Sequence, residues 1–221
     1  MNFMDRVIAR SMPLWEAAAS EPFVTAMGEG NLSRELFYGY IVQDSIYLRD
    51  YLKAYAMAIF KSRTLREMQV FYSALGFVND SENATRLGYL ADAGLTDAEV
   101  ESIPKRKACA DYTRFLVETA EREEIPEILM AVMPCMLGYR YVFEELEKRY
   151  PAVLDGYFGP LVRDYTGEGY AAACKTWTDY CEEVCAPLSA ERKERLAGIF
   201  EEASRHELYF WRMAGDSHET E

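Results

Sequence analysis

The stretch SRELFYGYIVQDSIYLRDYLKAYAMAIFKS, residues 33–62, decides the fold class. Its apolar residues recur at intervals of three and four, which is the period of an amphipathic helix. Ser33 suits the N-cap position and the stretch contains no proline, so we expect one continuous helix over about 33–62. The same period dominates the rest of the chain, and the alternation typical of half-buried strands is nearly absent.

Capping and breaking residues mark the other helices. Glu99 stands three residues after Thr96, which is the spacing of a capping box, and Pro104 ends the short helix that follows. Pro126 lies near the first turn of a helix that Pro151 stops. The other segments predicted to be helical are the first twenty residues and about 66–79, 81–94, 105–122, 126–149, 167–186 and 190–214.

The chain shows no internal repeat, no linker rich in Ser and Gly, and no step in composition. We therefore predict one all-α domain of about eight helices over residues 1–214. Residues 215–221, GDSHETE, are expected to form a solvated tail.

Composition and charge exclude several classes of protein. The 221 residues carry a formal net charge of −13, and half of them are apolar. A chain of this length and apolar content can bury a sizeable core, so it is neither disordered nor fibrous. Because Lys and Arg dominate binding to nucleic acids and anionic membranes, the negative charge argues against both as partners.

The sequence favours the cytoplasm. No run of 18 apolar residues is present, so no membrane-spanning helix is expected. Charged residues interrupt the first twenty residues, which we interpret as an amphipathic helix of the mature protein rather than a signal peptide. The five cysteines are an odd number that does not suit a disulfide framework, and a reducing compartment fits them best.

Asp44 has an unusual place on the helix predicted over 33–62. Its neighbours on the same helix face are Tyr40, Ile41, Tyr47, Leu48 and Tyr51. A carboxylate among apolar side chains must be paired or hydrogen-bonded, or its pKa rises until it is neutral. Asp44 is therefore either a structural carboxylate held by a tyrosine hydroxyl or a functional residue.

Cys135 follows a proline inside a predicted helix. Pro134 removes one helical hydrogen bond, so we expect a kink immediately before Cys135, and the loosened turn could expose the thiol to a cavity. Tyr139 lies one turn further on the same face. A cysteine in such a place is either a buried hydrophobe or a nucleophile that needs a nearby base.

Glu207 repeats the pattern of Asp44 on the last helix. Its same-face neighbours are the apolar or small residues Phe200, Ala203, Ser204, Phe210 and Trp211. Two inward carboxylates and a candidate thiol on three helices suit covalent acid/base chemistry in one aromatic pocket.

Metal and haem sites are not expected. Cys174, Cys181 and Cys185 recur at helical spacing, but no clustered histidine or second cysteine pair accompanies them. Both histidines, His206 and His218, lie near the C-terminus, which excludes a haem held by a histidine on an early helix. The sequence also lacks the Glu-x-x-His pairs of di-iron bundles.

Three motifs together resemble the TenA family (thiaminase II, aminopyrimidine aminohydrolase). They are QDSIYLRDY around Asp44, PCMLGY around Cys135 and EASRHELYFW around Glu207, and their spacing is similar to the family's over nearly the whole chain. The segment EPFVTAMGEGNLSRELFYGYIVQD, residues 21–44, resembles the start of the family's sequences. The resemblance implies the haem-oxygenase-like all-α fold without haem or other cofactor, assembled as a homotetramer.

The resemblance also implies an activity and a set of site residues. The expected reaction is hydrolysis of a 4-amino-2-methylpyrimidine at its 5-methylene group in thiamine salvage, releasing ammonia from the aminomethyl compound or the thiazole from thiamine. Cys135 would be the nucleophile, Glu207 the acid/base, and Asp44 the acceptor for the ring amidine. The other residues expected to bind the substrate are Tyr47, Tyr112, Tyr139, Tyr170 and Phe210.

The chain departs from the family pattern at residues 136–138 and 170–177. These departures affect the expected specificity for the leaving group more than the expected recognition of the pyrimidine ring. Two alternatives therefore stay open. One is a TenA-like hydrolase of a related heteroaromatic amine, and the other is a pyrimidine-binding or regulatory protein without turnover.

Overall fold

The computed structural model is built almost entirely of helices. It describes residues 2–80 and 82–216, without the side chains of 74, 76–80, 82 and 83. Within these residues there are eleven α-helices, one 3₁₀ helix and no strand, so the predicted all-α class is confirmed. The elements are α1 (Phe3–Ala18), α2 (Pro22–Gly28), α3 (Arg34–Lys61), α4 (Leu65–Asp80), α5 (Glu82–Asp92), α6 (Asp97–Ser102), α7 (Lys107–Arg122), α8 (Ile125–Arg149), η1 (Pro151–Asp155), α9 (Gly159–Thr166), α10 (Glu168–Cys185) and α11 (Ala190–Gly215).

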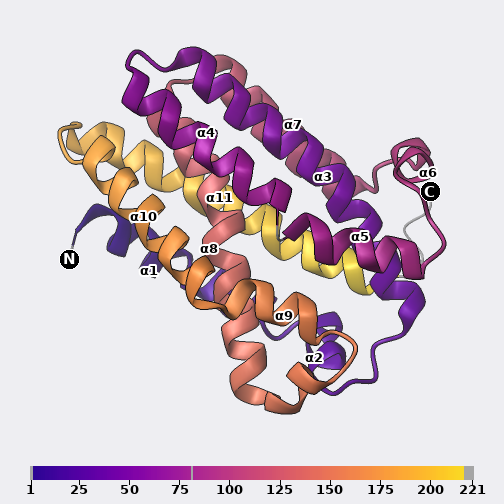
Figure 1. Cartoon of the computed structure of the whole chain (residues 1–221). Helices are drawn as coiled ribbons and strands as arrows, with labels where there is room; N and C mark the ends of the chain where they lie inside the picture. The colour runs from indigo at the N-terminus through magenta and orange to yellow at the C-terminus, as the bar shows by residue number, and fades with distance from the viewer. Residues whose placement is uncertain (1, 81, 217–221) are drawn as a thin grey trace.

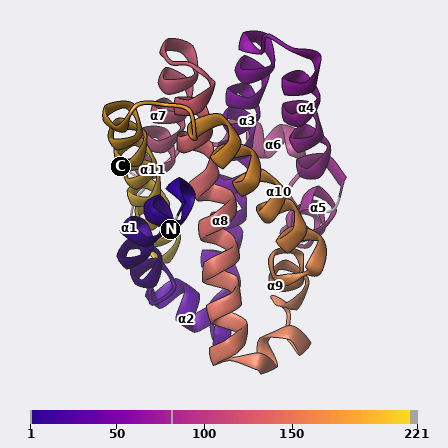
Figure 2. The ribbon, with the colours of Figure 1, turned by 90° about the vertical axis from the view of Figure 1, so that its left-hand side faces the viewer.

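Helix α8 lies at the centre of the molecule. Figure 2 shows α1, α2 and α11 on one side of it and α3, α4, α5, α9 and α10 on the other. In Figure 1, α3 and α7 run side by side above α11, and α8 crosses α11 steeply. Most of α8 between residues 127 and 143 is buried, so this helix carries apolar side chains to both halves of the core.

The capping residues identified in the sequence act as expected. The Ser33 hydroxyl accepts from the backbone N–H of Leu36 at 3.2 Å, and both hydrogen bonds of the capping box at Thr96 are present. Pro126 lies in the first turn of α8, where a backbone N–H would not form a hydrogen bond within the helix, so the missing N–H of proline costs nothing. Helix α8 continues through Pro134 to Arg149 as one element.

Three short elements were not expected from the sequence: α2, η1 and α9. Their five to eight residues are too few to show a helical period. The expected count of about eight helices was therefore too low. The predicted tail at 215–221 lies, from residue 217 on, outside the described residues.

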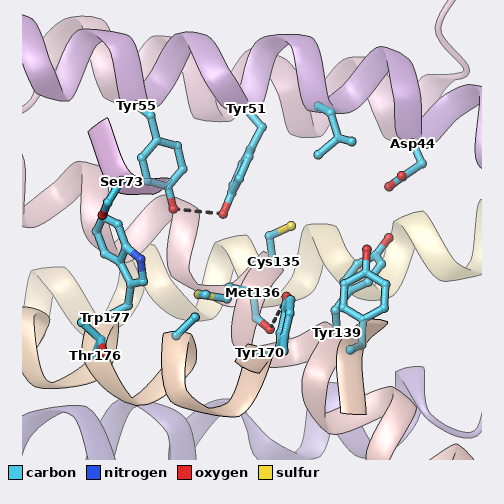
Figure 3. A pocket seen from close by; sticks show the side chains of 13 residues that line it. Asp44, Tyr51, Tyr55, Ser73, Cys135, Met136, Tyr139, Tyr170, Thr176 and Trp177 are labelled. Carbon is cyan, nitrogen blue, oxygen red and sulfur yellow. Dashed lines mark hydrogen bonds between the residues drawn. The ribbon is translucent and has the colours of Figure 1, made fainter. Parts of the chain in front are cut away.

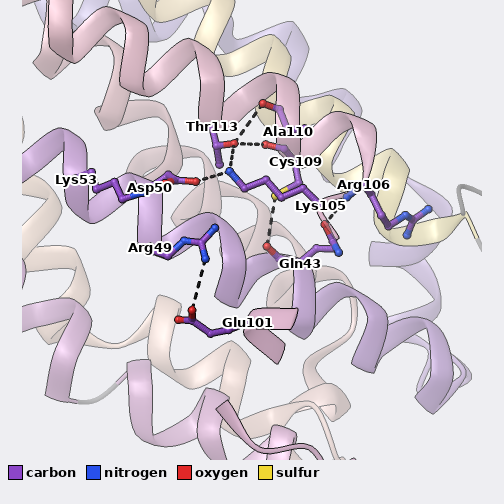
Figure 4. A network of polar contacts seen from close by, with 10 residues as sticks. All are labelled: Gln43, Arg49, Asp50, Lys53, Glu101, Lys105, Arg106, Cys109, Ala110 and Thr113. Carbon is purple, nitrogen blue, oxygen red and sulfur yellow. Dashed lines mark hydrogen bonds and ion pairs between the residues drawn. The ribbon is translucent and has the colours of Figure 1, made fainter. Parts of the chain in front are cut away.

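Helix α7 begins two residues later than predicted because α3 holds the preceding segment in an extended form (Figure 4). The Gln43 side chain donates to the carbonyl of Pro104 at 3.1 Å and accepts from the N–H of Arg106 at 2.8 Å. Beside it, Lys105 pairs with the buried Asp50 and donates to Thr113 Oγ1 at 2.8 Å. These contacts fix α7 against α3, which matters for the site because α7 carries Tyr112.

No helix among the described residues is long and apolar enough to cross a membrane.

Candidate active site

A cavity of about 200 Å³ opens between α3, α4, α8, α9 and α10 (Figure 3). Asp44, Cys135, Tyr139 and Tyr170, four of the residues selected from the sequence, line it. The other lining residues are Leu48, Tyr51, Tyr55, Ser73, Met136, Tyr165, Ala173, Thr176 and Trp177. Most of this wall is aromatic or apolar, and Asp44 is its one carboxylate among the described residues.

Cys135 differs from the other four cysteines, which are fully buried in the core. Its side chain is half-buried and lies in the middle of the cavity, between Asp44 and Trp177 (Figure 3). Burial raises the pKa of the thiols of Cys109, Cys174 and Cys185 to about 12, so these three stay protonated at neutral pH. Cys135 is therefore the thiol that a ligand in the cavity would meet.

Glu207 lies behind Cys135 and does not itself line the cavity, so a ligand would come within its reach at the Cys135 thiol, which Glu207 contacts. Its side chain is buried, and the Tyr112 hydroxyl donates to its Oε1 atom at 2.7 Å. Burial raises the pKa of Glu207 to about 8, and the nearby charge of Asp44 adds to this, while hydrogen bonds from Tyr112 and Cys135 act against it. At neutral pH Glu207 is mainly a carboxylic acid in contact with the thiol.

Asp44 lies at one end of the cavity, and the same face of α3 continues along it through Leu48, Tyr51 and Tyr55. These residues follow at intervals of four, three and four, so α3 forms one wall over roughly 16 Å at 1.5 Å per residue. Asp44 is largely buried, with 9% of its surface exposed, and it faces the space beside Tyr139. A ligand at this end meets a carboxylate and an aromatic ring together.

The other three residues selected from the sequence form a buried layer beside Glu207. Tyr47 contacts Tyr112 and Phe210, with ring centroids 4.9 and 5.7 Å apart. The three rings are buried and are not among the residues that line the cavity. Their position behind the wall means that they keep water away from Glu207.

Several lining residues were not singled out in the sequence. Tyr165 lies on α9, a helix that the sequence pattern does not reveal, and Ser73 and Trp177 reach the cavity only through tertiary packing. Tyr51 and Tyr55 hydrogen-bond to one another at 3.0 Å, and Tyr51 also donates to the carbonyl of Val132. The sequence already places Tyr51 on the helix face of Asp44, and Tyr55 follows it one turn further on, so this face of α3 could have indicated both as lining residues.

The departures from the family pattern fall partly on the cavity. Met136 and Ala173 line it, as does Tyr170, whose hydroxyl donates to the carbonyl of Met136 at 3.1 Å. Gly138 faces away, because a Cβ atom there would meet the Trp15 ring at 3.4 Å. Among the described residues, no group of three or more His, Cys, Asp or Glu side chains could hold a metal ion.

Comparison with known proteins agrees with the resemblance seen in the sequence. The chain is 28% identical over 215 residues to an aminopyrimidine aminohydrolase of Halalkalibacterium halodurans, covering 97% of this chain and 96% of the relative. A TenA family transcription regulator from a Silicibacter species has a crystal structure that matches with a TM-score of 0.86 and 27% identity over 96% of both chains.

The fold itself is confirmed by a more distant structure. A protein of Shewanella denitrificans described as having a heme oxygenase-like fold matches with a TM-score of 0.76 at 13% identity, covering 96% of this chain and 91% of that one. The model of the TENA/THI-4/PQQC family matches residues 8–217. The chain belongs to the TENA/THI-4/PQQC family.

Proposed function

We propose that this protein hydrolyses 4-amino-2-methylpyrimidines that carry a leaving group on the 5-methylene carbon, with Cys135 as the nucleophile. The observation that carries the proposal is the contact between the cavity-facing thiol of Cys135 and the buried Glu207, whose pKa is raised to about 8. A nucleophile beside a group that can both take and give a proton near neutral pH suits addition to a heteroaromatic ring. The similarity to relatives named aminopyrimidine aminohydrolase supports the same reaction.

The substrate ring would lie at the Asp44 end of the cavity. Asp44 would accept hydrogen bonds from the amidine edge of the ring, and the side chains of Tyr139 and Tyr170 would flank its apolar faces. Tyr47, Tyr112 and Phe210 would support these walls from behind. In this pose the 5-methylene carbon lies beside Cys135, and its substituent extends toward Tyr55 and Trp177.

The first step is addition of the thiol to the ring. The Cys135 sulfur bonds to the ring carbon next to the one that bears the methylene, while Glu207 gives its proton to the adjacent ring nitrogen and takes the thiol proton. The electron pair of the 4-amino group then forms an exocyclic methylene. An amine leaving group departs with the bonding pair and the proton of Glu207.

Water completes the reaction. Its hydroxyl adds to the exocyclic methylene, its proton returns to Glu207, and the ring recovers its electron pair. Loss of the sulfur together with the ring-nitrogen proton restores the Cys135 thiol and releases the hydroxymethylpyrimidine. Glu207 thus alternates between acid and base, a role that its raised pKa supports.

The aminomethyl compound, which releases ammonia, and thiamine, which releases its thiazole, are the proposed substrates, in a salvage pathway for thiamine. We place the enzyme in the cytoplasm, where its five free cysteines would stay reduced. Residues 1–214 are proposed to act as one domain, since the buried apolar side chains from α1 to α11 form one cluster.

A homotetramer is the proposed assembly. Phe60 at the end of α3 and Leu65 and Tyr72 on α4 are 87%, 70% and 72% exposed, although their side chains are large and apolar. Exposed apolar side chains on two helices that pack against one another favour contact with a second copy of the chain. Light scattering of the wild type and of the Phe60→Asp/Tyr72→Asp variant tests this, because loss of the assembly only in the variant is expected.

A ligand-binding protein without turnover is the second candidate, because one similar structure is described as a transcription regulator. The test measures product formation from 5-aminomethyl-2-methylpyrimidin-4-amine and from thiamine, together with calorimetric binding of both compounds. The enzyme predicts turnover by the wild type, and binding without turnover by Cys135→Ser and Glu207→Gln. Tight binding without turnover by the wild type would favour the regulator. A hydrolase of a related heteroaromatic amine would act on neither compound.

A further inference from the structure

Tyr112 connects Glu207 to a residue outside the cavity. The Tyr112 hydroxyl donates to Glu207, and its ring is stacked on the imidazole of His206, with centroids 5.2 Å apart and planes at 6°. His206 directly precedes Glu207 on α11, so the two side chains leave the helix about 100° apart. One side chain contacts Cys135 and the other lies against α7, yet both contact the same tyrosine.

The stack on His206 restricts how far the Tyr112 ring can swing sideways. Tyr47 contacts the ring at a centroid distance of 4.9 Å, and Phe115 contacts the His206 ring at 5.1 Å. Rotation about the Cβ–Cγ bond leaves the hydroxyl oxygen in place, but a sideways swing of the ring about the Cα–Cβ bond would displace it. Because a hydrogen bond weakens steeply as its angle departs from linearity, such a swing would weaken the bond to Glu207. The rings of His206 and Tyr47, which contact Tyr112, therefore preserve the hydrogen bond from Tyr112 to Glu207.

We propose that His206 is a positioning residue, which holds the Tyr112 ring in the orientation in which its hydroxyl donates to Glu207. The inference rests on the proposed function only in that Glu207 is the group that moves protons there. His206 acts through Tyr112 and has no contact with the cavity, since it is not among the lining residues.

The surroundings of His206 keep its imidazole neutral at pH 7. Burial lowers the pKa of His206, and the charges around it act in opposite directions. Glu202 and Asp111 raise the pKa, while Arg114 and Arg205 lower it. The surface hollow beside it, which admits solvent, is also lined by Lys107, Asp111, Tyr209, Arg212 and Asp216. Because the imidazole of His206 acts as a neutral flat ring that stacks on Tyr112, a phenylalanine side chain can take its place.

The first readout is the titration of Glu207 itself. Infrared difference spectra of the ligand-free protein follow its protonated carboxyl band, which is assigned by its absence in Glu207→Gln. Because the hydroxyl of Tyr112 stabilises the carboxylate form, we expect His206→Ala and Tyr112→Phe to raise the pKa of Glu207. His206→Phe should titrate as the wild type does, and His206→Ala/Tyr112→Phe should titrate as Tyr112→Phe does.

The second readout is turnover. His206→Ala is expected to lower kcat about tenfold with KM within about twofold, and to add no further loss in the Tyr112→Phe background. His206→Phe should restore kcat. His206→Leu, which fills the space without a flat ring, replaces His206→Ala in both readouts if the alanine variant does not fold.

The proposal is overturned if His206→Ala leaves the pKa of Glu207 unchanged or lowers it, as water entering an opened space would do. It is also overturned if the effects of His206→Ala and Tyr112→Phe add. If the wild type turns over neither pyrimidine, the proposed function fails, but the infrared titration still decides the role of His206.

Discussion

The raised pKa of Glu207 makes the stability of the protein depend on pH. In the unfolded chain this carboxyl has a pKa of about 4.3, and in the folded protein burial raises it to about 8. The folded state therefore holds its proton more tightly than the unfolded state does. The stability that this provides is fully present below the unfolded pKa, and it is lost as the pH rises toward 8.

The perturbation is Glu207→Gln, which removes the titration and keeps an oxygen that can accept from Tyr112. At 1.36 kcal/mol per pKa unit, the wild type should lose about 2.5 kcal/mol relative to the variant between pH 5 and 7. The loss should reach about 4 kcal/mol by pH 9 and then level off, because Glu207 is ionised in both states. Between pH 5 and 9 the stability difference should thus shift by about 4 kcal/mol in favour of the glutamine variant.

Urea unfolding followed by circular dichroism, at one-unit steps from pH 5 to 9, measures this difference. Glu191→Gln, an exposed position in the first turn of the same helix, is the matched control and should show little change with pH. A constant difference between the wild type and Glu207→Gln across this range would show that burial does not raise the pKa of Glu207. The proposed acid/base role would then lose its physical basis.

Three other predictions concern the scaffold. Replacing Lys105 by methionine leaves the buried Asp50 with Lys53 alone, so urea unfolding at pH 7 should show a loss of about 2 kcal/mol. Burial raises the pKa of Asp50, but its bonds to Lys105 and Lys53 outweigh this and hold the pKa below its usual range. The loss should therefore shrink as the pH falls below about 4, and a loss that is the same at pH 7 and pH 3 would contradict the pairing. Gly159→Ala places a Cβ against the backbone carbonyl of Leu154, and thermal unfolding should show a lower Tm. Gly39→Ala, by contrast, meets open space in the second turn of α3 and should stabilise the protein by about 1 kcal/mol, so equal effects of the two substitutions would refute the packing argument.

The sequence predicted the long helices well because each of them carries its own signals. Their apolar period spans several turns, and residues such as Ser33 and Pro126 mark their first turns. The six-residue helix α6 was found from its capping box at Thr96 alone. The short helix α9 has a proline, Pro160, in its first turn, but its eight residues are too few to show an apolar period. Contacts with α8 and η1 hold it in place. Missing α9 also meant missing Tyr165, which reaches the cavity from it.

The site could be predicted where a residue differs chemically from its neighbours on the same helix face. Asp44 and Glu207 are carboxylates on apolar faces, and Cys135 follows a proline, so each could be found without knowledge of its neighbours. Which of them touch is a tertiary property. The bond from Tyr112 to Glu207 joins residues 95 positions apart, and no local pattern encodes it. The role of His206 is hidden for the same reason.

The buried aromatic layer explains why Glu207 can act as an acid near neutral pH. The family resemblance led us to expect Tyr47 and Phe210 among the residues that bind the substrate, and in the structure they lie behind the residues that line the cavity. There they remove water from around Glu207, and this burial is the main cause of its raised pKa. A substitution of Phe210 by a small polar residue should therefore lower the pKa of Glu207 without touching a ligand. The chemistry proposed for Cys135 thus depends on packing one layer away from the cavity.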